Sequence, residues 1–206
     1  MGASERPVAD KERDASRQAP AVLSFLGLEP GMTVIDINAS TGWYTEVLAY
    51  AVGDNGMVYM QNRPGGSADE AASARAARFD NVQQVAAVSD VPAGSADFAL
   101  TALNFHDFHN SNPALAQGIL AQVATALRPG GTLGIIDHEG TPGADNESLH
   151  RIAFDELVKA VLNSENFALI GVSDLLDNPL DDQSARPFDP ALERNTDRIV
   201  LKFVRL

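Results

Sequence analysis

Short apolar runs alternate with amphipathic stretches along most of the chain. The first run, Thr33–Ile37, is rich in β-branched residues, which is typical of a strand buried on both faces. The stretch that follows, Trp43–Val52, repeats its apolar positions with the period of a helix. Runs of the same two kinds predict further strands at 57–60, 82–88, 98–103, 132–136, 167–172 and 199–204, and helices at 20–26, 69–79, 113–127 (with Asn112 as its cap) and 148–162.

This order of elements predicts the fold class. Strands that alternate with helices at this spacing form a doubly wound, Rossmann-like α/β domain with about seven strands in a mostly parallel sheet. No clear helix separates the last two predicted strands, so we expect them to form an antiparallel pair at the sheet edge. With 206 residues, the chain is long enough for one domain and short for two.

Two segments carry no regular pattern. The polar residues 1–16 predict an N-terminal arm, loose or packed on the surface, that precedes a domain at 17–206. The Asp- and Pro-rich segment 174–197 is too long for a bare connection, and we expect it to pack over the sheet or the active site. The arm has no apolar core of a secretory signal, so we expect a cytoplasmic protein, or a periplasmic or secreted one if a signal peptide has been removed.

The composition limits the partners that we expect. There are 28 acidic and 15 basic residues, a formal net charge of −13, and such a surface repels phosphate backbones and anionic lipids. We therefore expect no nucleic acid or membrane as main partner, and a monomer or homodimer. No apolar run approaches the roughly 20 residues that a transmembrane helix needs. The chain has no cysteine, which excludes disulfides, thiolate zinc sites and cysteine nucleophiles.

The loop after the first predicted strand is the first candidate binding site. Ligands of open α/β sheets bind at the carboxyl ends of the strands, beside the point where the strand order reverses. The small residues at 39–42 let a ligand approach the backbone closely. The helix that follows presents N–H groups and the positive end of its dipole, which suits a carboxylate.

Two segments resemble class I S-adenosylmethionine (SAM) methyltransferases. PGMTVIDINASTGWYTEVLA (30–49) resembles their first strand, loop and helix, and LRPGGTLGIID (127–137) resembles their fifth strand and the turn before it. More narrowly, the chain is similar to a bacterial group of predicted methyltransferases with an undefined acceptor, in four features: GWYTEVLA, NFHD (104–107), DH (137–138) with LHRI (149–152), and SDLLDNPLDD…FDP…TDRIVLKF. The resemblance implies SAM as cofactor, S-adenosylhomocysteine as product and a small-molecule methyl acceptor.

The resemblance also implies a set of cofactor-binding residues. They are Asp36, Asn38, Ser40 and Gly42 in the loop, Tyr44 in the helix, Gln61 and Asn62 after the second strand, Asp90 after the third and Asn104 after the fourth. Asp36 has a second interpretation, as a buried carboxylate that only shapes the loop. Of Tyr44 and its neighbour Trp43, we expect one to pack in the core, while the other could face the pocket.

This set departs from the family pattern at two places. The usual loop is Asp-x-Gly-x-Gly-x-Gly, and only Gly42 of the three glycines is present. Asn tolerates positive φ, so we expect Asn38 to preserve the turn, whereas the Cβ of Ser40 could crowd the cofactor. The acidic residue that usually binds the ribose is replaced by Gln61 and Asn62, which can donate and accept hydrogen bonds but carry no charge.

The candidates for chemistry lie after the fourth and fifth predicted strands. Methyl transfer needs mainly alignment, and it needs a base only if the acceptor is protonated. His106 or His138 could be that base, oriented by Asp107 or Asp137. The same side chains could instead bind a divalent metal, or they could be purely structural. All four histidines, His109 and His150 included, are expected on the ligand side of the sheet.

Two hypotheses of function follow, with a third less favoured. The first is SAM-dependent methyl transfer to a small molecule, with His106, Asp107 and His138 on the acceptor side. The second is a non-catalytic, methyltransferase-like binding module with an eroded SAM loop. The third is a metal-dependent enzyme that uses the His and Asp residues. The chain has no nucleophile elbow, P-loop or zinc-protease motif, so a hydrolase is poorly supported.

Overall fold

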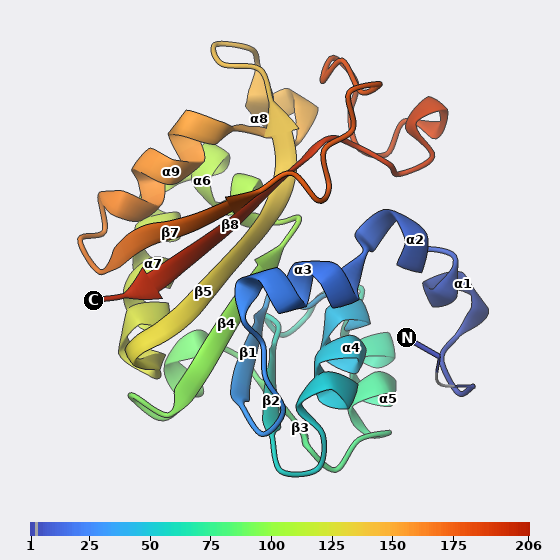
Figure 1. Ribbon diagram of the computed structural model, residues 1–206, viewed down its shortest axis with the longest axis vertical. Helices are drawn as coiled ribbons and strands as arrows, with labels where there is room; N and C mark the ends of the chain where they lie inside the picture. Colours follow the sequence, from blue (N-terminus) through green and yellow to red (C-terminus); the bar gives the residue numbers. More distant parts are fainter. Residues whose placement is uncertain (3) are drawn as a thin grey trace.

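A twisted sheet with helices on both faces forms the body of the protein (Figure 1). The computed structural model describes residues 1–2 and 4–206. The strand order is β3-β2-β1-β4-β5-β8-β7, with β6 paired to β5, and β8 is the strand that runs antiparallel to its neighbours β5 and β7. The strands are β1 Thr33–Ile37, β2 Met57–Gln61, β3 Val82–Val85, β4 Ala96–Ala102, β5 Leu127–Gly140, β6 Ile152–Ala153, β7 Phe167–Ser173 and β8 Arg198–Arg205.

The helices divide between the two faces of the sheet. One face packs against α3 (Ala19–Leu26), α4 (Trp43–Val52) and α5 (Asp69–Ala76), and the other against α7 (Pro113–Ala126) and α9 (Phe154–Leu162) (Figure 1). Alternate residues of β1 explain this: Val34 packs with α3 and α4, while Ile35 packs with the opposite core. This confirms the predicted doubly wound fold and the antiparallel pair at the edge, and the Asn112 side chain accepts from the N–H of Leu115 as the predicted helix cap.

Several elements differ in detail from the prediction. The strand predicted at 132–136 is the middle of the longer β5, so Asp137 and His138 lie inside that strand and not after it. The predicted helix 148–162 is divided into α8 (Asn146–Leu149), β6 and α9, because His150 adopts a left-handed φ of 52° that ends α8. The predicted strand 82–88 ends at Val85, and a 3₁₀ turn, Val88–Asp90, follows it. The short helix α6, Phe105–Ser111, was not predicted.

The N-terminal arm packs onto the domain through two short helices, α1 (Val8–Lys11) and α2 (Asp14–Arg17). The indole N–H of Trp43 donates to the Asp10 carbonyl at 3.0 Å, and the Asp10 carboxylate lies 2.6 Å from the Arg75 guanidinium. The arm therefore lies over the start of α4. Ala3, which belongs to the predicted arm, lies outside the described residues.

Segment 174–197 is held by a buried ion pair. The guanidinium of Arg151 lies 2.9 Å from a carboxylate oxygen of Asp181, and both side chains are fully buried. Arg151 also donates to the carbonyls of Glu139 and Ala185, so its hydrogen bonds join the end of β5 to this segment. Among residues 1–2 and 4–206, none of the helices has the length and apolar composition needed to cross a membrane.

Candidate functional site

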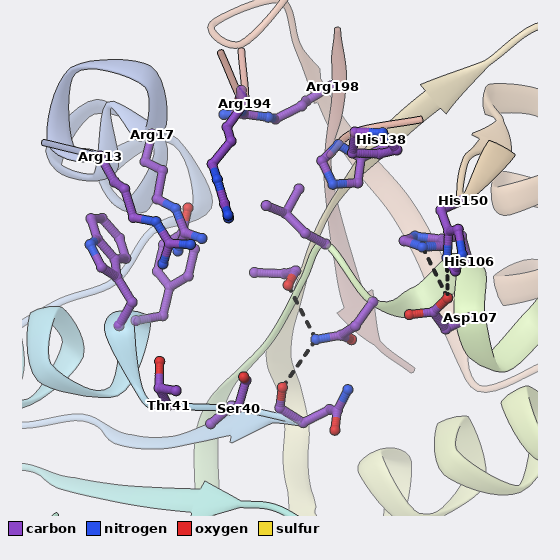
Figure 2. Close-up of a pocket in the computed structure, with 18 of the residues that line it drawn as sticks. Arg13, Arg17, Ser40, Thr41, His106, Asp107, His138, His150, Arg194 and Arg198 are labelled. Atoms are coloured by element: carbon purple, nitrogen blue, oxygen red, sulfur yellow. Dashed lines mark hydrogen bonds and ion pairs between the residues drawn. The ribbon is translucent and has the colours of Figure 1, made fainter. Parts of the chain in front are cut away.

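A cavity of about 410 Å³ opens at the carboxyl ends of β1, β4 and β5. This volume lies within the roughly 300–1,000 Å³ that is usual for small-molecule sites. The cavity is placed between β1 and β4, where the strand order reverses. The arm and segment 174–197 complete its wall, the latter through Pro187, Phe188 and Arg194. Figure 2 shows Arg194 extending into the cavity.

The β1 loop turns on three residues in the left-handed region. Asn38 has φ 51°, Ser40 φ 54° and Gly42 φ 81°. The prediction that Asn38 preserves the turn by adopting positive φ is therefore confirmed. Ser40 also adopts positive φ, and because it has a Cβ, this conformation costs roughly 1–2 kcal/mol relative to glycine. At Gly42 an added Cβ would lie 2.6 Å from the methyl of Met60 and 2.9 Å from Cδ of Arg75, so both of these flexible side chains would have to shift.

Gln61 and Asn62 hold this loop in place. The Gln61 side-chain oxygen accepts from the N–H of Asn38 at 3.0 Å. The Asn62 side chain accepts from the N–H of Ser40 at 2.8 Å and donates to the Ser40 carbonyl at 2.9 Å. These two amides are therefore bonded to the loop backbone and do not belong to the cavity wall. Their predicted contact with the cofactor ribose remains a prediction.

Asp36 is buried in the wall of the cavity, with 2% of its surface exposed. Burial raises the pKa of its carboxyl to about 7, and the Thr45 hydroxyl and the charge of Arg17 offset only part of that effect. The hydroxyl of Thr45 donates to the carboxylate at 2.6 Å. Asp36 is thus tied to the first turn of α4, which fits both interpretations, loop support and ligand contact.

Asn104 joins the end of β4 to the β1 loop. Its amide N–H₂ donates to the carbonyls of Ile37 and Asn38, both at 3.3 Å, and its oxygen accepts from the Thr101 hydroxyl. Trp43 and Tyr44 were predicted to divide two roles, one packing in the core and the other facing the pocket. In the structure each does both, because both are almost fully buried and both line the cavity.

His106 is held between two carboxylates. Its Nδ1 lies 2.7 Å from an oxygen of Asp137, and its Nε2 lies 3.2 Å from an oxygen of Asp107. Burial alone would lower its pKa, but the charges and hydrogen bonds of Asp137 and Asp107 outweigh burial and raise the pKa to about 10. His106 is therefore an imidazolium at neutral pH, which makes it a cation and hydrogen-bond donor and a poor base.

His138 has the opposite protonation state. Burial, together with the positive charge of Arg198 and other nearby cations, lowers its pKa well below the ordinary value of 6.5. Its Nδ1 lies 2.6 Å from the Thr196 hydroxyl, and the ring lies in the cavity wall (Figure 2). A neutral imidazole whose Nδ1 donates to that hydroxyl has Nε2 as a proton acceptor.

The other two histidines differ in position. His150 lines the cavity and its Nδ1 lies 3.0 Å from Asp107 (Figure 2). His109 does not line it, because its ring stacks on Phe105 and its Nε2 lies 3.2 Å from Glu156 of α9. The expectation that all four histidines lie on the ligand side is therefore wrong for His109, which the unpredicted helix α6 turns toward α9.

The metal interpretation has a geometric basis in His106, Asp107 and His150, whose nearest ligand atoms all lie within 4.8 Å of one another. The same atoms already contact one another, because an oxygen of Asp107 lies 3.2 Å from His106 Nε2 and 3.0 Å from His150 Nδ1. A cation at this position would have to displace those contacts. The geometry thus favours hydrogen bonding over metal binding.

Four arginines of the cavity wall were missed from the sequence: Arg13, Arg17, Arg194 and Arg198. They come from the arm, segment 174–197 and the first residue of β8, and two of those three regions have no periodic pattern.

Asp90 is the opposite case, a residue that was predicted but does not belong to the cavity. It was predicted to contact the cofactor, but its carboxylate accepts from the N–H groups of Ala86 and Ala87 and does not line the cavity.

Comparison with known proteins identifies the fold. No family model and no curated protein matches the sequence. Among solved structures, a SAM-dependent methyltransferase from Aquifex aeolicus superposes with a TM-score of 0.70 at 19% identity, over 98% of this chain and 99% of that chain. The chain has the SAM-dependent methyltransferase fold.

Two further structures with this methyltransferase fold are similar. One is a SAM-dependent methyltransferase from Mesorhizobium loti, with a TM-score of 0.64 and 16% identity over 92% of this chain and 98% of that chain. The other is the 1,6-didemethyltoxoflavin-N1-methyltransferase of Burkholderia thailandensis, which contains its substrate and S-adenosylhomocysteine. It has a TM-score of 0.66 and 19% identity over 96% of this chain and 81% of that chain. The methyltransferase fold thus extends over nearly the whole chain.

Proposed function

We propose that this protein transfers a methyl group from SAM to a small molecule. The observation that carries the proposal is the position of the cavity, at the carboxyl ends of β1 and β4 in a sheet with the methyltransferase fold. The cofactor would lie over the β1 loop, with its carboxylate at the first turn of α4. Asp36, Asn38, Ser40, Tyr44 and Asn104 would surround it.

Four of the predicted cofactor residues would act on SAM indirectly, by shaping or holding the loops of the site. They are Gly42, Gln61, Asn62 and Asp90. Gly42 allows the loop its left-handed turn, and the two amides hold that turn by their bonds to the loop backbone. Asp90 holds the connection after β3 in the same way. Direct contacts of these four with SAM stay a prediction from the sequence and are separate from this indirect role.

The opposite protonation states of His138 and His106 would give the two histidines different roles toward the acceptor. An atom of the acceptor attacks the SAM methyl carbon, the carbon–sulfur bond breaks, and its electron pair stays on sulfur to give S-adenosylhomocysteine. His138 is neutral and would take the proton that the acceptor loses. His106 is an imidazolium whose two N–H groups are bonded to Asp137 and Asp107, and it would act on the acceptor through its positive charge.

Calorimetric titration with S-adenosylhomocysteine tests the cofactor half of this proposal. We expect micromolar binding to the purified protein, and affinity rising severalfold in Ser40→Gly, because glycine removes both the Cβ and the left-handed strain. Ser67→Gly, in the loop after β2, is the matched control and should bind as the wild type does. No binding up to millimolar concentration in either the wild type or Ser40→Gly would contradict the proposal and favour the non-catalytic binding module.

A further inference from the structure

The cavity gathers arginines in a protein that is otherwise strongly acidic. Of the 15 lysines and arginines in the chain, four arginines line this one cavity, against a net charge of −13 for the whole protein. Figure 2 shows Arg13 and Arg17 side by side, and Arg194 extending into the same space from the C-terminal segment. Arg198 lies at the far end of this group.

These four arginines differ from Arg6, Arg75 and Arg151, which are also partly or fully buried, in having no acidic partner, although Arg194 itself is exposed. Arg6, Arg75 and Arg151 each form an ion pair with an aspartate or glutamate. Within residues 1–2 and 4–206, none of the four cavity arginines has a carboxylate in ion-pair distance. In the part of the chain that the structure describes, their positive charge is therefore not neutralised by an ion pair.

One of the four has a structural role that explains its position. The guanidinium of Arg198 donates to the carbonyls of Ser16 and Arg194 and to the Thr196 hydroxyl. It thus joins the arm to segment 174–197. No hydrogen bond is found for the side chains of Arg13, Arg17 and Arg194 among the described residues, so these three are left to be explained.

Arg17 shows that the uncompensated charge is costly. Its guanidinium lies 4.4 Å from the ring centre of Trp43, and burial, together with the charges of Arg13 and Arg198, lowers its pKa to about 10. A cation–π contact recovers only part of the cost of burying a charge. A charge kept in this environment without a partner in the chain indicates a ligand that supplies one.

SAM alone does not supply enough negative charge. It has one carboxylate, one ammonium and one sulfonium group, so it enters the cavity with a net charge of about +1. Its carboxylate can neutralise one guanidinium, while its sulfonium adds another positive charge. The acidic side chains of the cavity do not neutralise the remaining positive charge. Burial raises the pKa of Asp36 to about 7, and Asp107 already contacts both His106 and His150.

We propose that the methyl acceptor is a small anion whose carboxylate or phosphate group is bound by Arg13, Arg17 and Arg194. This inference rests on the proposed methyltransferase function. Guanidinium groups bind both kinds of oxyanion through paired hydrogen bonds, and three of them on one side of the cavity anchor the anionic end of the acceptor. The other end then lies toward His138, the proposed base.

Two anionic probes test the proposal on the intact protein saturated with S-adenosylhomocysteine. Benzoate represents a carboxylate acceptor and inorganic pyrophosphate a phosphate-bearing one, and each is titrated by calorimetry. We expect at least one to bind without displacing S-adenosylhomocysteine, with the tighter one identifying the acceptor's oxyanion. Arg194→Gln changes an exposed side chain and should weaken that binding about tenfold, since hydrogen bonds to charged groups are the stronger ones.

The controls distinguish failure of the anionic-acceptor proposal from failure of the methyltransferase proposal on which it rests. Arg128→Gln, at the opposite end of β5, removes the same charge outside the cavity and should leave probe binding unchanged. If S-adenosylhomocysteine binds but neither probe does, the anionic acceptor is refuted and the methyltransferase proposal stands. If the probes displace S-adenosylhomocysteine, the arginines serve the cofactor carboxylate and the acceptor proposal is refuted as well. If S-adenosylhomocysteine itself does not bind, the proposed function fails first.

Discussion

Substitution of Asp36 by asparagine should stabilise the protein more at pH 8 than at pH 5. The carboxyl has an ordinary pKa of 3.8 in the unfolded chain and about 7 in the folded protein, because burial disfavours the charged form. The folded state therefore holds the proton to higher pH than the unfolded state does. The stability contributed by this proton is complete below the unfolded pKa and is lost as pH rises through about 7.

The expected size follows from these two values. One pKa unit corresponds to about 1.4 kcal/mol, so the full loss above pH 7 is about 4 kcal/mol. At pH 5 about 1.6 kcal/mol of it has been lost, so about 2.5 kcal/mol is lost between pH 5 and pH 8. Relaxation around a buried charge reduces such values, and we expect about 1–2.5 kcal/mol to be measured.

Urea unfolding of the wild type and Asp36→Asn at the two pH values measures this difference directly. Asparagine keeps an oxygen for the Thr45 hydroxyl and has no proton to lose, so every other titrating group cancels between the two proteins. Asp80→Asn, on an exposed carboxylate, is the matched control and should show no difference between the two pH values. Equal effects of Asp36→Asn at pH 5 and pH 8 would refute the assigned cause.

Three further predictions concern the loop, the C-terminal segment and the base. Gly42→Ala should lower the free energy of unfolding by about 1–2 kcal/mol, because φ is 81° there and the added Cβ meets a side chain at 2.6 Å. The control Gly118→Ala, inside α7 with open space around it, should raise the free energy of unfolding slightly. Asp181→Asn should cost about 3 kcal/mol in urea unfolding by leaving the Arg151 charge buried without its partner; a loss below 1 kcal/mol would contradict that. His138→Gln should lower kcat about 100-fold with unchanged S-adenosylhomocysteine affinity, and the wild-type rate should fall only well below pH 6.5 on acidification; an acid limb at the ordinary histidine pKa would contradict a neutral, buried base.

The strands of the sheet could be predicted because burial on both faces demands apolar, β-branched runs. Thr33–Ile37 and the helix Trp43–Val52 were predicted with the bounds that the structure has. Helix α6 could not be predicted in the same way, since its seven residues are mostly polar or aromatic and too few to show a period. Its position depends on Asp137, which accepts from the N–H of His106 after folding brings β5 beside β4.

The loop and the histidines of the candidate site were accessible from the sequence, whereas the arginines were not. His106 follows the end of β4 and His138 lies near the carboxyl end of β5, and the carboxyl ends of parallel strands meet at one edge of the sheet. Arg13 and Arg194 lie in segments without periodicity, and only tertiary packing places both on one cavity. The protonation states were inaccessible for the same reason, because neighbours from distant parts of the chain set the pKa values of the two histidines in opposite directions.

The place of β8 in the sheet has a consequence for synthesis of the chain. This strand is the last along the sequence, yet it lies between β5 and β7 and not at an edge. As the chain emerges from the ribosome, β5 has an unpaired edge and β7 has no partner until Arg198–Arg205 appears. Premature termination before this strand would leave both open to pairing with other chains, so truncated products are expected to aggregate and not to accumulate as folded, inactive protein.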